Sequence, residues 1–160
     1  MIPPLPDPLH PAVVHLPIAL AAILPLFVLL GILARRLGFP PGRTWAVVVA
    51  LQALLYLTAS YAARTGEAQQ DRVEPVVGEA ALERHEQAAE RAVLFAGIAA
   101  GVALLGFLPG RLGGAARLAA LVAALTVLAA VALAGSSGGD LVWRHGAAAA
   151  YAKPPVAQPD

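Results

Sequence analysis

The chain has 160 residues, of which 59% are hydrophobic and 13% are charged, and its net charge is +1. A soluble domain usually has about twice that share of charged residues, so the composition favours an integral membrane protein and gives no basis for binding nucleic acid. Because the chain has no cysteine, disulfides, thiolate-bound iron–sulfur clusters and covalently attached haem are excluded.

Long uncharged runs predict four membrane-spanning helices, since about 20 apolar residues cross the hydrocarbon core of a bilayer. We place the spans at residues 11–34, 44–64, 80–109 and 115–137. An outer loop is expected at residues 65–79, and an outer C-terminal tail at residues 138–160. The spans make up most of the chain, so residues 1–160 are predicted to form a single membrane domain.

The first span follows a proline-rich segment, Ile2–Pro8, that has no Lys or Arg. His10-Pro11 marks the expected start of the helix, because proline suits the first turn. Arg35 and Arg36 follow the apolar run. Positive charge after the run rather than before it is typical of an uncleaved anchor whose amino terminus faces outward.

Short turns rich in glycine and proline join the first span to the second at residues 38–42 and the third to the fourth at residues 109–114. Such turns predict antiparallel neighbours, and therefore an all-α, up-down-up-down four-helix bundle. Arginines without acidic neighbours lie in and beside these turns: Arg35, Arg36, Arg43, Arg111 and Arg117. Dense positive charge in short loops marks the cytoplasmic face, so both termini are expected on the outer, periplasmic side of a bacterial inner membrane.

The first residues of the third helix, Gly78–Arg91, are mostly strong helix formers, so this helix is expected to begin near Gly78 and to project beyond the bilayer. Along it, small residues follow a histidine at helical spacing: His85, Ala88, Ala89, Ala92, Ala96 and Ala99. Small residues let membrane helices approach closely. The stripe is therefore expected to face the bundle interior, with His85 at its outer end.

All four histidines are predicted to lie at the outer edge of this bundle. His10 and His15 open the first span, His85 precedes the third, and His145 follows the fourth. Imidazole is a common ligand of metal ions and of haem iron near neutral pH. The gathering of histidines at one level therefore indicates a cofactor or metal site.

The motifs around these histidines resemble a bacterial four-helix membrane family known as domain of unknown function 2231. The resemblance rests on the segments His10–Leu20 and Gly138–Gly146, on Thr65-Gly66 and on His85, and it covers nearly the whole chain. Members of that family are sometimes fused to Rieske-type or c-type cytochrome modules, which implies an electron-transfer setting. This chain has no such module, so a partner would have to supply it.

These observations favour a b-type cytochrome subunit that binds haem b without a covalent bond and transfers electrons. His15 and His85 are the expected axial ligands, because they lie on different helices and small residues make room for the macrocycle. His10 and His145 are expected to hold a second haem or to contact propionates, and the expected propionate partners are Arg64 and Arg144.

Two alternatives remain open at this point. The first is a non-haem Zn, Cu or Fe site formed by the same histidines, and the second is a structural anchor subunit of a larger membrane complex. No nucleophile–base pair or phosphate loop is recognisable, so a non-catalytic electron-transfer or binding subunit is favoured over an enzyme. The expected partners are the lipid bilayer, a periplasmic redox protein or other membrane subunits, with a homo-oligomer as a further option.

Overall fold

The computed structural model describes residues 6–152, so the expectations that concern residues 1–5 and 153–160 lie outside the described part of the chain. The long helices are α2 (His15–Arg36), α3 (Pro41–Glu67), α5 (Glu79–Leu105) and α6 (Gly110–Trp143). The short ones are α1 (His10–Val13), α4 (Gln70–Val77) and the 3-10 helix η1 (Ala147–Tyr151). Residues 6–152 contain no strand, which confirms the all-α prediction.

Four stretches of this structure are long and apolar enough to cross a membrane. They are α1 with α2 (27 residues), α3 from Gly42 (26 residues), α5 (27 residues) and α6 (34 residues). At about 1.5 Å per residue, each exceeds the roughly 30 Å of a bilayer's hydrocarbon core. Large apolar side chains such as Leu29 and Leu57 are exposed on the outside of the bundle. The prediction of four membrane-spanning helices is confirmed, and these outer surfaces face lipid.

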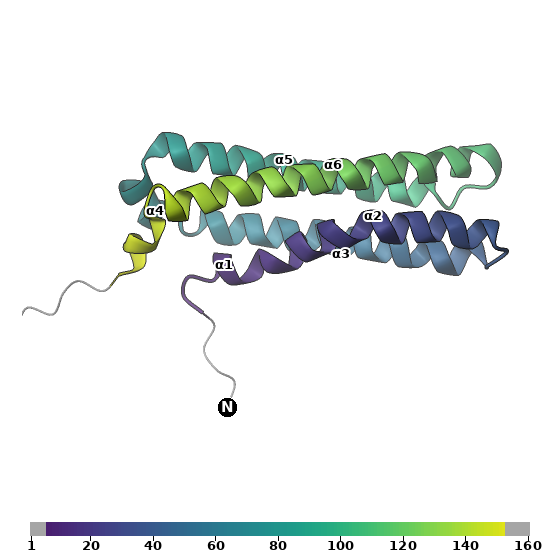
Figure 1. The fold of residues 1–160 in the computed structure, drawn as a ribbon, viewed down its shortest axis with the longest axis horizontal. Helices are drawn as coiled ribbons and strands as arrows, with labels where there is room; N and C mark the ends of the chain where they lie inside the picture. Colours follow the sequence, from purple (N-terminus) through teal and green to yellow (C-terminus); the bar gives the residue numbers. More distant parts are fainter. Residues whose placement is uncertain (1–5, 153–160) are drawn as a thin grey trace, which may run out of the picture.

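Successive long helices run in opposite directions, with both short turns at one end of the bundle (Figure 1). Helices α5 and α6 pack through small side chains: Ala92, Ala96 and Ala99 on α5 are buried in the same cluster as Ala120 and Ala124 on α6. Because an alanine side chain is a single methyl group, the helix axes can approach closely. The small-residue stripe that begins at His85 is thus part of the bundle core.

The first membrane span consists of α1 and α2, which meet at Val14. The dihedral angles of Val14, φ −63° and ψ −23°, are helical, so the two form one continuous span. Pro17 has no N–H group with which to bond the carbonyl of Val13, so one hydrogen bond is missing at this point. His10 lies at the outer end of the span, one turn before this missing bond.

The segments expected as an outer loop and an outer tail are largely helical. Residues 65–79 contain the last turn of α3 and all of α4, and residues 138–143 continue α6 before η1 follows. A small apolar cluster, Val73, Val77, Ala81, Leu82, Leu141 and Ala147, joins α4 to α5, α6 and η1. Figure 1 places α4 and η1 at the end of the bundle opposite the two short turns.

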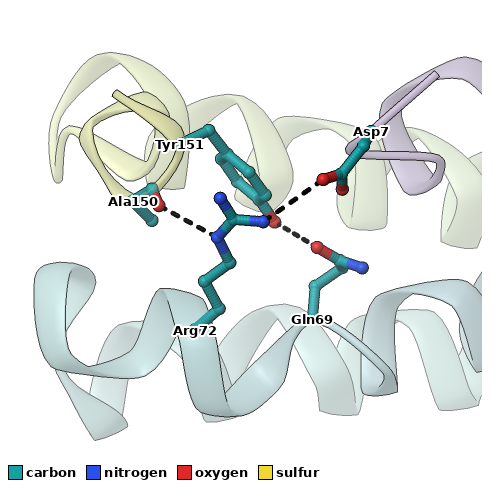
Figure 2. A network of polar contacts seen from close by, with 5 residues as sticks. All are labelled: Asp7, Gln69, Arg72, Ala150 and Tyr151. Atoms are coloured by element: carbon teal, nitrogen blue, oxygen red, sulfur yellow. Dashed lines mark hydrogen bonds and ion pairs between the residues drawn. The ribbon is translucent and has the colours of Figure 1, made fainter. Parts of the chain in front are cut away.

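Polar contacts tie the two ends of the described chain to α4 (Figure 2). Arg72 on α4 donates to the carbonyl of Ala150 at 3.0 Å and pairs with Asp7 at 3.5 Å. Its guanidinium also lies over the ring of Tyr151, 4.3 Å from the ring centroid, and the Tyr151 hydroxyl donates to Gln69 at 2.7 Å. Helix α4 therefore holds the segment before α1 and the segment after α6 together.

The bundle consists of two similar helical hairpins, residues 10–67 and 79–143. Their turns repeat one another: Leu37–Arg43 and Leu105–Arg111 differ only where Pro40 in the first corresponds to Leu108 in the second. Each hairpin has a histidine near the start of its first helix, His10 or His85. Each turn, considered alone, indicates only that the chain reverses direction. The internal repeat becomes visible when the sequences of the two hairpins are aligned with one another.

Candidate functional site

Two histidines from different hairpins lie together at the end of the bundle that also holds α4. The ring centroids of His10 on α1 and His85 on α5 are 6.1 Å apart, and the ring planes meet at 76°. Both side chains are half-buried. Although 75 residues separate them in the sequence, the antiparallel packing of the hairpins places the two imidazoles side by side.

The His10 ring is held by the last turns of α3. Its Nδ1 lies 2.9 Å from the carbonyl oxygen of Ala62 and 3.3 Å from the Thr65 hydroxyl oxygen. The Thr65 hydroxyl itself donates to the Ala62 carbonyl at 2.8 Å. A carbonyl oxygen can only accept a hydrogen bond, so Nδ1 must be the donor and must hold a proton.

The His85 ring is held in the same way by α6. Its Nδ1 lies 3.0 Å from the hydroxyl oxygen of Ser137, and that hydroxyl donates to the carbonyl of Ala134 at 2.9 Å. Because the hydroxyl proton is used in the bond to Ala134, the Ser137 oxygen accepts the proton on Nδ1. Both histidines are therefore protonated on Nδ1.

A glycine after each hydroxyl residue lets the ring lie against the helix. A Cβ atom on Gly66 would lie 3.1 Å from Cε1 of His10, and one on Gly138 would lie 3.0 Å from Cε1 of His85. The two histidine-binding segments are Ala62–Gly66 and Ala134–Gly138, and they share the pattern Ala-x-x-Ser/Thr-Gly. Thr65-Gly66 is among the motifs that indicate the family, whereas Ser137 was missed, although the repetition of this pattern would have identified it.

The hydrogen bonds have a direct chemical consequence. In a neutral imidazole with its proton on Nδ1, Nε2 has a free lone pair and can bind a metal. Metal-binding histidines commonly donate their other N–H to a carbonyl or carboxylate, which fixes the tautomer and orients the ring. His10 donates to the carbonyl of Ala62 in this way, whereas His85 donates to the Ser137 hydroxyl oxygen; both rings are thereby oriented before any metal is bound.

The other two histidines do not join this pair. The His15 side chain is exposed, and its Nδ1 lies 3.3 Å from the carbonyl oxygen of Ala12 in its own helical turn. His145 follows α6 and is also exposed. Within residues 6–152, no group of three or more His, Asp or Glu side chains is placed to hold a metal ion. The structure therefore pairs His85 with His10, not with the expected His15, and it does not assemble the expected four-histidine cluster.

The two arginines expected near the site are both exposed. Arg64 lines an open groove between α3 and α5 together with Glu67 and Glu90. Arg144 pairs with Asp140, one turn earlier on α6, at 3.2 Å. Because both members of this pair are exposed to solvent, it adds little stability to the fold.

The fold and the histidine pair define a helical, multi-pass membrane protein with two imidazoles at one end of its bundle. Residues 6–150 match the family described as a predicted membrane protein, DUF2231, and the chain belongs to that family. This match confirms the resemblance that rests on the histidine motifs. No curated protein and no solved structure matches the chain.

Proposed function

We propose that His10 and His85 are the axial ligands of a haem b, and that the protein exchanges electrons through this haem at the outer face of a bacterial inner membrane. The observation that supports the proposal most directly is the pair of imidazoles, 6.1 Å apart, with each Nδ1 occupied by a hydrogen bond. Both rings thus keep Nε2 available for iron.

The number of ligands favours haem over a bare zinc or iron ion. A structural zinc site needs four protein ligands, and a catalytic one needs three. Haem iron already has four nitrogen ligands from its macrocycle and needs only two from the protein. A pair of histidines with no third ligand among the described residues matches the second requirement.

The spacing of the rings also agrees with binding on opposite sides of one metal. An imidazole nitrogen binds a transition metal at about 2 Å, and the ring centre lies about 1 Å further from the metal. Two imidazoles facing one another across a metal therefore have centroids about 6 Å apart, close to the separation of His10 and His85.

The position of the pair limits the direction of electron transfer. All four histidines of the chain are found at residues 10, 15, 85 and 145, so none lies near the two arginine-rich turns. With one haem at one end, the chain would exchange electrons with a partner at that face of the membrane and would not pass them across the bilayer alone. A periplasmic redox protein or another membrane subunit is the partner that this placement favours.

The test is the visible absorption spectrum of the purified protein before and after reduction with dithionite. We expect a Soret shift and a sharp α-band on reduction, both lost in His10→Ala and in His85→Ala. His15→Ala is the matched control and keeps the spectrum, because the His15 ring is exposed and its Nδ1 lies beside the carbonyl of Ala12 in its own turn. An α-band that survives His85→Ala would contradict the assignment.

Copper is the second candidate. Two imidazoles with no third ligand among residues 6–152 also suit an ion of low coordination number, and imidazole is a good copper ligand. A featureless visible spectrum combined with about one copper per chain, lost in His10→Ala and in His85→Ala, would favour copper over haem. Protein that binds neither haem nor metal would instead favour a structural anchor subunit.

A further inference from the structure

An arginine is buried at the end of the bundle opposite the histidine pair. Arg117 lies two turns into α6 and is only 6% exposed. Within residues 6–152, no hydrogen bond or ion pair joins it to another side chain, and its one described contact is with the indole of Trp45, 5.6 Å from the guanidinium carbon. The chain has no acidic residue between residues 8 and 66 or between residues 91 and 139. Among residues 6–152, no carboxylate is therefore near enough to neutralise this cation.

The surroundings of Arg117 hold it in one place. The indole N–H of Trp45 donates to the carbonyl of Ala103 at 2.8 Å, which fixes the ring that the guanidinium contacts. Gly113 allows α6 to begin directly against the carbonyl of Leu108, where any Cβ atom would overlap. Nη2 of Arg117 lies 3.5 Å from the position that this Cβ would occupy, so the guanidinium reaches back toward the first turn of α6.

The first turn of α6 is itself a site for an anion. Helix α6 begins at Gly110 after Pro109, and no side chain caps it. The first four N–H groups of a helix have no partner within the helix, and the aligned peptide dipoles give this end a partial positive charge. A buried guanidinium and a helix N-terminus thus point to the same small region, and both favour a negatively charged group.

We propose that this region binds the phosphate group of an anionic membrane lipid. A buried cation without a counter-ion is costly, and a phosphate would accept hydrogen bonds from both the guanidinium and the free N–H groups. Leu108 and Leu112, on either side of the helix start, are exposed and suit contact with acyl chains. Arg43 and Arg111, which lie beside the two short turns at this end, add to the attraction for an anionic leaflet. The proposal is independent of the histidine pair.

The test is thermal unfolding of the full-length protein in a neutral detergent, with phosphatidylglycerol, phosphatidylcholine or inorganic phosphate added at equal concentration. We expect phosphatidylglycerol to raise Tm, because a ligand that binds only the folded state stabilises it. Phosphatidylcholine and inorganic phosphate are expected to give no comparable rise. An equal rise in Tm with phosphatidylcholine would overturn the proposal that the site selects an anionic lipid. An equal rise with inorganic phosphate would overturn the proposal that the bound phosphate belongs to a lipid.

The variants Arg117→Gln and Arg36→Gln each remove one positive charge from the same end of the bundle. Arg36 is exposed at the end of α2, so it is the matched control. The rise in Tm should be lost in Arg117→Gln and kept in Arg36→Gln. An equal rise in both variants would show that general attraction to positive charge is sufficient, and would overturn the proposed site.

A second measurement does not require Arg117→Gln to fold. Trp45 and Trp143 are the two tryptophans of the chain, and Trp143 is 86% exposed near the opposite end, so Trp143→Phe leaves Trp45 as the single fluorophore. In mixed vesicles, brominated phosphatidylglycerol should quench Trp45 more strongly than an equal fraction of brominated phosphatidylcholine. Equal quenching by the two lipids would contradict a phosphate site selective for anionic lipid.

Discussion

At the scale of single residues, two hydroxyl groups decide how the histidine pair can react. Thr65 and Ser137 each donate to a carbonyl three residues earlier in their own helices. Their oxygens can then only accept from the neighbouring imidazole, which places the proton of each ring on Nδ1. The two nitrogens that remain free, Nε2 of His10 and Nε2 of His85, are the ones that a haem or metal would bind.

Ser137→Ala removes the acceptor of the His85 ring without changing the ligand itself. We expect the affinity for added haemin, measured by absorbance titration, to fall by about 10–100-fold, which is the usual effect of losing a group that orients a ligand. Ser136→Ala is the matched control, because the Ser136 hydroxyl bonds only to the carbonyl of Leu133 in its own helix. Equal affinities in the two variants would show that the Ser137 hydroxyl does not orient His85.

At the scale of the helices, close packing lies where the start of α3 meets the end of α5. Trp45 on α3 is 1% exposed, and its ring lies against Gly106, which follows the last residue of α5. A Cβ atom on Gly106 would overlap the indole of Trp45. Because the hydrogen bond to Ala103 holds the indole in place, the ring has little freedom to move away.

Gly106→Ala should therefore destabilise the bundle. Adding a methyl group to a well-packed core costs typically about 1–3 kcal/mol, and we expect a corresponding fall in Tm during thermal unfolding in detergent. Gly101→Ala is the control on α5, since a Cβ atom there would meet nothing within 4 Å. Alanine is the better helix former, so this control should be as stable as the parent protein or more stable. A Gly106→Ala variant as stable as Gly101→Ala would contradict the packing described.

Tertiary contacts stabilise α4 as a helix, although the segment is short. Its eight residues, Gln70–Val77, include Pro75, and a helix of this length is marginal in water on its own. The sequence therefore favoured a loop. In the structure, Val73 and Val77 are buried against Leu141 and Ala147, residues more than 60 positions later in the chain. This burial is a non-local effect, and no local pattern indicated it.

At the scale of the whole molecule, charge is strongly divided between the two ends of the bundle. The arginines without acidic neighbours lie by the two short turns, and all acidic residues of the described chain lie toward the end with α4. By the positive-inside rule, this division predicts that the short turns face the cytoplasm and that α4 and the histidine pair face the periplasm.

Cysteine labelling tests this orientation directly, because the natural chain has no cysteine and gives no background. Val76→Cys on α4 and Phe39→Cys in the short turn between α2 and α3 each replace an exposed side chain. In intact cells whose outer membrane admits small molecules, a maleimide that cannot cross the inner membrane should label Val76→Cys at once. It should label Phe39→Cys only after the inner membrane is permeabilised, and the reverse pattern would invert the proposed topology.

The sequence by itself determined the all-α class, the number of membrane spans, the family and the level at which the histidines lie. These features follow from local properties: apolar runs, turn residues and short motifs around each histidine. Only the tertiary structure decided which histidines meet. His10 and His15 lie five residues apart, about 140° around a helix, so they face different sides of their span. The contacts of His10 with Ala62 and Thr65 bring it to His85, and His15 is exposed. The pairing of His10 with His85 depends on how the two hairpins pack against each other. The sequence of one hairpin alone does not determine that packing.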